Sequence, residues 1–184
     1  MIQMKENLPD RKHIRHKHFD YNDGIIFLTI CTKDRRCVLS RIVGTDVLDG
    51  PKIELLPHGK IADKFINELD EFYENISVLK YVIMPNHIHL LLQIRNADRR
   101  GRRSLHKCEQ LSSADVEAGH LQKSALSKFC STFKRFCNKE FGENIWQRGS
   151  YDHVIRSDLD LDRHIEYIQS NPLNWYYDEL FIEQ

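Results

Sequence analysis

The spacing of apolar residues along the first half of the chain predicts both strands and helices. Residues 24–32 (GIIFLTICT) are mostly apolar and rich in β-branched side chains, and an Asn-Asp-Gly turn signal opens them, which predicts a strand. Residues 60–69 place their apolar side chains at helical spacing and predict an amphipathic helix. Residues 76–84 and 87–94 are both strand-like, and the Pro-Asn pair between them suits a tight turn, so they predict a β-hairpin.

The second half opens with a polar stretch and then returns to regular patterns. Apolar residues are sparse over 96–122, which predicts a loop insert that is partly disordered. Residues 126–141 carry an apolar stripe with basic residues outside it, which predicts a basic amphipathic helix. Residues 145–157 indicate a turn and a short strand. Ser157 is a suitable N-cap for a last helix, which should run to Asn171 because a proline follows.

This order of elements predicts a single domain over residues 1–184. Strand, helix, strand hairpin, helix, strand and helix suggest an α+β sandwich with a central, largely antiparallel sheet flanked by helices. A chain of 184 residues, 41% hydrophobic and 29% charged, has room for one such core. There is no apolar run of membrane-spanning length and no signal-peptide pattern, so we expect a cytoplasmic protein without a membrane partner.

The charges are balanced overall but unevenly distributed. The formal net charge is zero, yet residues 1–150 carry 25 Lys and Arg against 19 Asp and Glu, and residues 151–184 carry two against eight. The bases gather in a basic N-terminal arm (residues 1–20), at 99–103 and on the 126–141 helix. Such asymmetry is typical of a nucleic-acid surface, although ordinary solvated faces explain any single cluster equally well.

Two histidines stand at the start of the aliphatic strand 87–94. Strand side chains alternate between faces, so His87 and His89 should project together while Ile88 faces the other way. Their Cα atoms should lie about 6.6 Å apart, twice the strand rise, which allows both imidazoles to reach one ion. The pair therefore predicts two ligands of a facial metal site. Two hydrogen-bonded, semi-exposed histidines explain the motif about as well.

The last predicted helix carries a column of polar side chains beside its apolar stripe. The column consists of Asp160, His164, Tyr167 and Asn171. At 100° per residue these four positions fall within about 60° of one another around the helix axis. A phenol and a carboxamide one turn apart can supply a nucleophile and a metal ligand. Alone, such a column is more often a plain amphipathic border, and its weight comes from its combination with the histidine pair.

Four blocks of the sequence, taken in order, resemble one known family. The blocks are FDYNDGIIFLTICTKDRR, YVIMPNHIHLLLQI, NIWQRGSYDHVIRS and RHIEYIQSNPLNW. They resemble the single-tyrosine HUH transposases, and among these they are most similar to the REP-associated tyrosine transposases, over roughly residues 14–176. The resemblance implies a ferredoxin-like, HUH-type sandwich.

The resemblance also implies an activity and the residues that carry it. The family cleaves and rejoins single-stranded DNA near hairpins through a 5′-phosphotyrosine, with a divalent cation. His87 and His89 match the two histidines of the HUH motif, Tyr167 matches the nucleophile, and Asn171 matches the residue that completes the metal site. The family and the phosphoryl chemistry suggest Mg²⁺ or Mn²⁺, although two imidazoles and an amide would also suit zinc.

Tyr151 is the competing nucleophile, because Asp152 and His153 follow it directly. The short strand should place Tyr151 and Asp152 on opposite faces, and the resemblance makes this block structural or part of the DNA groove, so we favour Tyr167. A tyrosine with an ordinary pKa of about 10 needs help to lose its proton. His164, one turn before Tyr167, is a candidate helper, though a surface histidine is the simpler interpretation.

The implied partner is single-stranded DNA that carries a hairpin. Basic side chains of the arm and of the 126–141 helix should contact its phosphates. These residues are Arg11, Lys12, Arg15, Lys17, Lys128, Lys134, Arg135 and Lys139. Trp146 and Trp175 are either base-stacking or buried. A homodimer and a monomer both fit the sequence.

Two rival functions belong to other classes. A histidine-triad hydrolase needs a third histidine at position 91, where this chain has Leu91, so the sequence disfavours it. A non-catalytic DNA-binding regulator descended from a transposase stays open, even though the proposed ligands and the tyrosine are all present.

Overall fold

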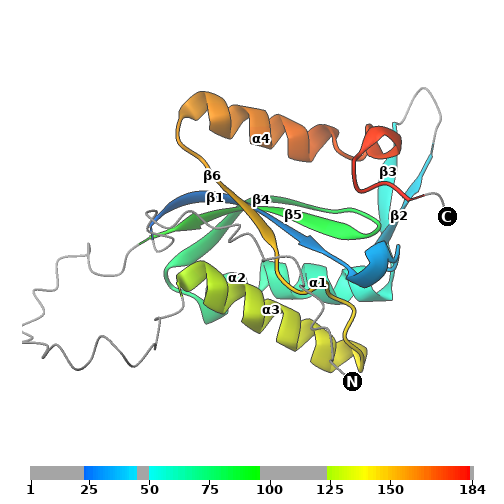
Figure 1. Ribbon diagram of the computed structural model, residues 1–184, viewed down its shortest axis with the longest axis horizontal. Helices are drawn as coiled ribbons and strands as arrows, with labels where there is room; N and C mark the ends of the chain where they lie inside the picture. The colour runs from blue at the N-terminus through cyan, green and yellow to red at the C-terminus, as the bar shows by residue number, and fades with distance from the viewer. Residues whose placement is uncertain (1–22, 45–49, 96–123, 183–184) are drawn as a thin grey trace, which may run out of the picture.

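The centre of the protein is a four-stranded antiparallel sheet with helices on both faces (Figure 1). The computed structural model describes residues 23–44, 50–95 and 124–182. The strands are β1 (Gly24–Cys31), β4 (Ile76–Ile83), β5 (His87–Ile94) and β6 (Tyr151–Val154), in the spatial order β4-β5-β1-β6. The α+β architecture predicted from the sequence is therefore confirmed, including the β4–β5 hairpin and its Pro-Asn turn.

The helices divide between the two faces of the sheet. Helix α4 (Asp158–Ser170) covers one face, and α1 (Pro57–Asn67) and α3 (Ala125–Phe141) cover the other (Figure 1). Short helices α2 (Leu69–Phe72), η1 (Lys33–Arg35) and η3 (Trp175–Tyr177) complete the helical elements that the structure describes. The sequence did not predict α2 or the small hairpin of β2 (Ser40–Val43) and β3 (Lys52–Leu55), because both are too short to show a period.

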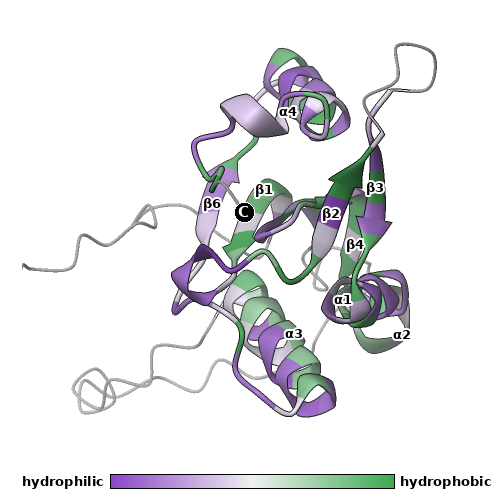
Figure 2. Cartoon of the chain, turned by 90° about the vertical axis from the view of Figure 1, so that its right-hand side faces the viewer, coloured by the Kyte–Doolittle hydropathy of each residue, from purple (hydrophilic) through white to green (hydrophobic). Residues whose placement is uncertain are grey.

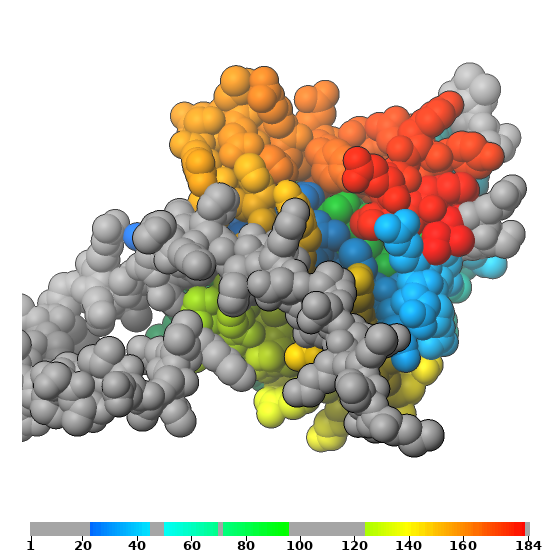
Figure 3. Space-filling view, in the orientation of Figure 1, coloured from blue at the N-terminus to red at the C-terminus, as the bar shows by residue number. Residues whose placement is uncertain are grey.

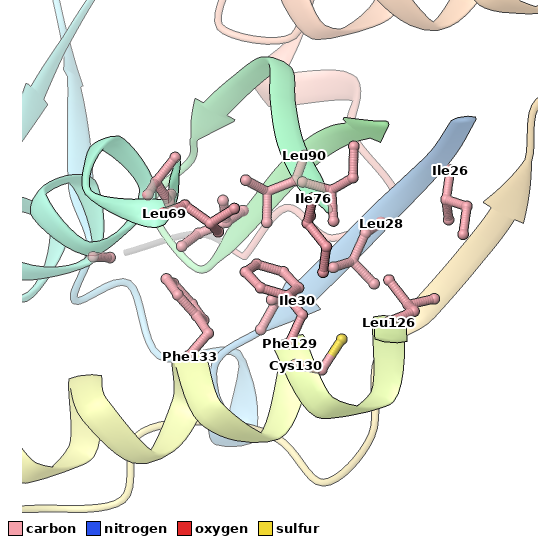
Figure 4. Packing of buried hydrophobic residues seen from close by; sticks show 14 of the residues in the cluster. Ile26, Leu28, Ile30, Leu69, Ile76, Leu90, Leu126, Phe129, Cys130 and Phe133 are labelled. Carbon is pink, nitrogen blue, oxygen red and sulfur yellow. The ribbon is translucent and has the colours of Figure 1, made fainter. Parts of the chain in front are cut away.

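Alternation along β1 and β5 produces the main core. On one face, Ile26, Leu28 and Ile30 of β1 pack against the apolar stripe of α3, where Phe129 is 1% exposed (Figure 4). Figure 2 shows the green and purple sides of α3 that this burial requires. Removal of a buried ring such as that of Phe129 costs about 3–5 kcal/mol, because a cavity remains. The α3 face of the sheet is thus its structural side.

The opposite face of the same strands carries a smaller cluster that includes polar groups. Phe27 of β1 and Leu91 of β5 lie there with Ile168 of α4 and the buried Trp175. Helix α4 begins where predicted, with the Ser157 Oγ accepting a hydrogen bond from the Asp160 N–H at 3.2 Å. Since the histidines of β5 point to this face, α4 brings its polar column over them.

Several expectations fall outside the residues that the structure describes. They concern the basic arm at 1–20, with Arg11, Lys12, Arg15 and Lys17, and the insert at 96–122. Among the described residues, no helix is both long and apolar enough to span a bilayer. Four cysteines of the described ranges are free thiols: Cys31, Cys37, Cys130 and Cys137.

Candidate active site

The histidine pair is buried at the start of β5 with its ring nitrogens facing each other. His87 is fully buried and His89 is 3% exposed. Their Nε2 atoms lie 2.9 Å apart. Ile88 points to the opposite core, as the strand alternation requires. Two Nε2 atoms at this separation match neighbouring corners around a single ion, since ligands at about 2.1 Å and right angles lie about 3 Å apart.

Hydrogen bonds from Asn86 and Thr29 fix how the two rings are oriented. The Asn86 amide Nδ2 donates to the Leu180 carbonyl at 2.7 Å, so its Oδ1 faces His87 Nδ1 at 2.8 Å. Because that oxygen only accepts, His87 Nδ1 carries the proton and its Nε2 presents a lone pair. On the other ring, Thr29 Oγ1 lies 2.9 Å from His89 Nδ1, a contact that the β1–β5 register creates by pairing Thr29 with His89. Such partners commonly orient metal-binding histidines.

Burial keeps both imidazoles neutral at physiological pH. Desolvation lowers the pKa of His87 to about 3. Desolvation, together with the neighbouring His87, lowers the pKa of His89 to about 3. A neutral imidazole is the form that binds a cation. Neither ring is therefore protonated to imidazolium, and neither has to release that extra proton before an ion binds.

Tyr167 and Asn171 of the α4 column lie beside the histidine pair in the same chain. The Tyr167 ring stands edge-on to His89, with ring centroids 5.2 Å apart. Its hydroxyl donates to Asp178 Oδ2 at 3.2 Å, and the Asn171 Nδ2 donates to the same oxygen at 3.1 Å. The Asn171 Oδ1 is buried and has no hydrogen-bond partner among the described residues. Such an orphaned acceptor is the group that a cation would satisfy.

Asp178 is the functional residue that the sequence analysis missed. Its carboxylate and the ring nitrogens of His87 and His89 lie within 4.8 Å of one another. The Leu180 N–H donates to Asp178 Oδ1 at 2.7 Å, so hydrogen bonds hold this oxygen as well as Oδ2. Asp178 follows the turn after α4, where helical periodicity no longer applies. In the sequence it is marked only as an acidic residue between an aromatic run and a short apolar run.

The C-terminal segment is held over the histidine pair by contacts from distant parts of the chain. Arg35 donates to the Glu179 carbonyl at 3.2 Å, and Asn86 donates to the carbonyl of Leu180. Figure 3 shows this red segment lying against the light-blue segment that follows β1. The indole of Trp175 also packs on His87, with ring centroids 5.9 Å apart. Asp178 is therefore positioned by the fold rather than by a free tail.

The Tyr167 side chain is 42% exposed, and its phenol is held in its protonated form. Burial raises its pKa to about 12, and the nearby Asp178 carboxylate adds to this rise. A cation beside the phenol would oppose both effects, because positive charge favours the phenolate. The candidate nucleophile is thus a phenol whose ionisation would be favoured by added positive charge.

An open pocket of about 670 Å³ leads to this group of residues. Its walls include Phe27, His89, Arg163 and Tyr167, and the rival tyrosine Tyr151 also lines it. Tyr151 reaches the pocket because the β1–β6 register pairs it with Thr29. The pocket is large enough for a nucleotide and has a cationic wall at Arg163. Both candidate nucleophiles face the same space, so only chemistry can separate them.

The donor set fits a divalent cation. His87 and His89 offer converging nitrogens, Asn171 offers an unpartnered oxygen and Asp178 offers a carboxylate. Mixed nitrogen and oxygen ligands suit Mn²⁺ and Zn²⁺ directly, and the oxygens suit Mg²⁺. The earlier half of the column contacts His153 of β6, Asp160 through a hydrogen bond and His164 through ring stacking, and His164 also lines the pocket.

The basic side chains of α3 lie on the sheet face opposite to α4 (Figure 1). Lys128, Arg135 and Lys139 are exposed there. Lys134 is different, since its ammonium donates to the carbonyls of Gln147 and Gly149, and burial lowers its pKa. This lysine fixes the turn before β6. The structure therefore brings none of the four described basic residues into the pocket at Tyr167.

Comparisons with known proteins agree with the resemblance seen in the motifs. No family model matches the chain. An uncharacterised protein of Haemophilus influenzae is 28% identical over 186 residues, covering 94% of each chain. A second protein of that organism, provisionally named a REP-associated tyrosine transposase, is 31% identical over 123 residues, which are 63% of this chain and 64% of that protein.

A solved structure provides the fold comparison. The structure of a REP-associated tyrosine transposase bound to a REP hairpin has a TM-score of 0.58 and 16% sequence identity, and the match covers 90% of this chain and 76% of that one. At this identity the likeness establishes the fold. By sequence motifs and by fold together, the chain is thus similar to the REP-associated tyrosine transposases and has the fold of a transposase.

Proposed function

We propose that this protein is a metal-dependent tyrosine transposase that cleaves and rejoins single-stranded DNA beside hairpins. One observation carries the proposal: in a single chain, Tyr167 and His89 line one pocket, and His87 and Asn171 lie directly behind them, within contact of His89 and of Asp178. The sequence relative and the hairpin-bound structural neighbour support DNA transposition as the process. Hairpin DNA is the partner that this likeness favours.

The chemistry follows from the groups around Tyr167. The phenolic oxygen attacks the scissile phosphorus, the bond to the 3′ oxygen breaks, and a 5′-phosphotyrosine and a free 3′-hydroxyl result. The phenolic proton passes to Asp178 Oδ2, which already accepts the hydrogen bond of that hydroxyl. The leaving 3′ oxygen takes up one proton from solvent, and Asp178 returns one proton to the solvent. Attack by a second 3′-hydroxyl on the phosphotyrosine reverses the reaction and joins new strands without external energy.

His87, His89, Asn171 and Asp178 would hold the cation. A bound Mg²⁺ or Mn²⁺ supplies Lewis-acid neutralisation of the phosphate oxygens. Asn86 and Thr29 keep the two imidazoles aimed at that point. Phe27 stacks on His89 at 5.0 Å between ring centroids and screens the pair from water.

A monomer is sufficient for this activity. The proposed nucleophile sits on α4 and the proposed ligands on β5, α4 and the C-terminal segment of the same chain. No second subunit has to deliver a tyrosine, so we propose that the protein cuts DNA in cis.

The decisive experiment compares two tyrosine variants on one substrate. Wild-type protein and Mn²⁺ are mixed with a 3′-labelled single-stranded hairpin oligonucleotide, and denaturing gels report the covalent adduct. We expect Tyr167→Phe to abolish the adduct, a loss of at least about 10³-fold, because the proposal assigns the attacking oxygen to Tyr167. Tyr151→Phe, which lines the same pocket, is the matched control and should keep it. An adduct that survives in Tyr167→Phe and disappears in Tyr151→Phe would overturn the assignment.

A non-catalytic regulator is the second candidate function. The raised pKa of Tyr167 favours it, since a phenol with a higher pKa supplies less phenolate as a nucleophile. The same oligonucleotide separates the two functions. Tight hairpin binding without an adduct in either Mg²⁺ or Mn²⁺ identifies a regulator, whereas an adduct that requires the cation identifies a transposase.

A further inference from the structure

A second group of possible metal ligands lies beside the candidate active site, and one of its members, His164, also lines the pocket at Tyr167. The group consists of His153 on β6 and of Asp160 and His164 on α4, which we call the β6–α4 cluster. One possible ligand atom from each residue lies within 4.8 Å of the other two. The proposed transposase chemistry uses none of these groups.

The distances in the β6–α4 cluster match the edges of a coordination shell. His153 Nε2 lies 3.0 Å from Asp160 Oδ2, and His164 Nδ1 lies 3.2 Å from Asp160 Oδ1. Ligands about 2.0–2.1 Å from one ion lie about 3.0–3.4 Å apart for angles between square and tetrahedral. The two imidazole rings are stacked, with centroids 4.8 Å apart and 17° between their planes, so one ring has to turn about its side-chain torsions for both nitrogens to bind one ion in their ring planes.

The three side chains are held in place by the backbone around them. The β1–β6 register pairs His153 with Phe27, and the ring of Phe27 also contacts that of His164 at 4.7 Å. The Arg156 N–H donates to Asp160 Oδ2 at 3.2 Å. Burial raises the pKa of Asp160, but the hydrogen bonds from His153 and from the Arg156 N–H lower it by more. The pKa is therefore below its ordinary value and the carboxylate is charged.

We infer that the β6–α4 cluster binds a transition-metal ion, of the class of Zn²⁺ or Co²⁺, independently of the histidine pair. Two imidazoles and one carboxylate are a common ligand set for such ions, and Mg²⁺ has little affinity for imidazole. His164 Nδ1 also donates to the Asp160 carbonyl at 2.7 Å, so the ion replaces this proton, which moves to Nε2 of the same ring. The ion fixes the edge strand β6 to the first turns of α4, the helix that carries Tyr167.

The test counts bound Co²⁺ in the full-length protein by equilibrium dialysis and follows the visible absorption of the bound ion. We expect His153→Gln to bind one Co²⁺ fewer per chain than the wild type, and to leave the remaining absorption unchanged. Asp160→Asn should show the same loss. Asp162→Asn, an exposed carboxylate on the same helix, is the matched control and should bind as much Co²⁺ as the wild type.

Two further measurements keep the test decisive. Asp160 also supports the start of α4, so His153→Gln, which leaves the Ser157 cap intact, separates metal loss from unfolding, and circular dichroism confirms the fold. Histidines of the N-terminal arm are present in every variant, so only the differences between variants are counted. If folded His153→Gln binds as many Co²⁺ ions as the wild type, the cluster is an ion-paired clamp only and the inference is wrong.

His87→Gln distinguishes this site from the proposed active site. We expect it to lose a different Co²⁺ and to keep the one that His153→Gln removes. A protein that forms no DNA adduct but loses one Co²⁺ in His153→Gln refutes the proposed function and leaves the second site standing. The reverse result refutes the second site alone.

Discussion

The described part of the chain contains two histidine clusters that differ in their exposure to water. His87 and His89 are at most 3% exposed, on a central strand, and their nearest partners are neutral side chains. The side chains of the β6–α4 cluster are 39%, 25% and 21% exposed for His153, Asp160 and His164, and a carboxylate bridges the two rings. Phe27 lies between the clusters and contacts a ring of each.

The difference shows how burial divides the two roles. In the buried pair, water and protons are excluded, so a cation would act on a phosphate in a medium of low polarity, where charge neutralisation is strongest. In the exposed cluster, the carboxylate already satisfies both imidazoles and water screens the charges, so an ion there would add rigidity and little chemistry. We therefore expect catalysis to depend on the first cluster and helix position to depend on the second.

The largest expected difference between the two clusters is in the rate of adduct formation. His87→Gln should reduce adduct formation on the hairpin oligonucleotide by about 10²–10³-fold, because the amide replaces a cation ligand at the reacting phosphate. His153→Gln, the matched change in the β6–α4 cluster, should change the rate by less than about threefold, the effect of a small surface perturbation. Equal losses in both variants would mean that the two clusters act as one site.

Acid should destabilise the fold through the buried pair. The folded pKa values of His87 and His89, about 3, lie below the unfolded value of about 6.5, so the unfolded chain binds more protons between these limits. The contribution of the neutral pair to the free energy of unfolding is fully present above pH 6.5. It is lost as the pH falls towards 3, by about 1.4 kcal/mol per pH unit for each imidazole.

Urea unfolding of the metal-free protein between pH 7 and pH 4 measures this loss. His89→Gln should reduce the slope of unfolding free energy against pH by the contribution of one imidazole. A wild-type slope close to zero over this range would show that the pair is protonated in the folded state.

The sequence predicted the helices and strands whose apolar pattern repeats over many residues, and it predicted that His87 and His89 project from the same face of one strand. The His87 and His89 geometry follows from alternation alone, and α4 begins at its Ser157 cap as expected. The four polar residues of the predicted column do lie along one side of α4. The sequence could not predict that Tyr167 and Asn171 lie near β5 while Asp160 and His164 lie near β6, because this depends on how α4 crosses the sheet (Figure 1).

The residues that orient the candidate site could not be found from local patterns. Thr29 meets His89 through a strand register that joins positions sixty residues apart. Asn86 links a histidine to Leu180, ninety-four residues later. Asp178 follows a turn after the last helix, where neither period applies. Pairings over such separations are decided by tertiary packing, which no window of the sequence contains.

Thr29 provides a sharper test of the buried pair. Thr29→Val keeps the side-chain volume but removes the hydroxyl that orients His89, so the midpoint for activation by Mn²⁺ should rise by about tenfold. The measurement is adduct yield against Mn²⁺ concentration, with the yield at saturation nearly retained. Thr132→Val on α3, across the sheet, is the matched control. An unchanged midpoint in Thr29→Val would show that His89 is oriented by its packing on Phe27 instead.

The smallest effect concerns the exposed cluster without metal. Asp160→Asn in the presence of a chelator should lower the free energy of unfolding by about 1 kcal/mol, because the amide accepts the Arg156 N–H and the His153 bond less strongly than the carboxylate does. Asp162→Asn should change it by less than about 0.5 kcal/mol, as an exposed surface change does. Thermal or urea unfolding at pH 7 measures both. If Asp160→Asn also lost adduct formation by the factor expected for His87→Gln, then the β6–α4 cluster would belong to catalysis, and the division between the two clusters would fail.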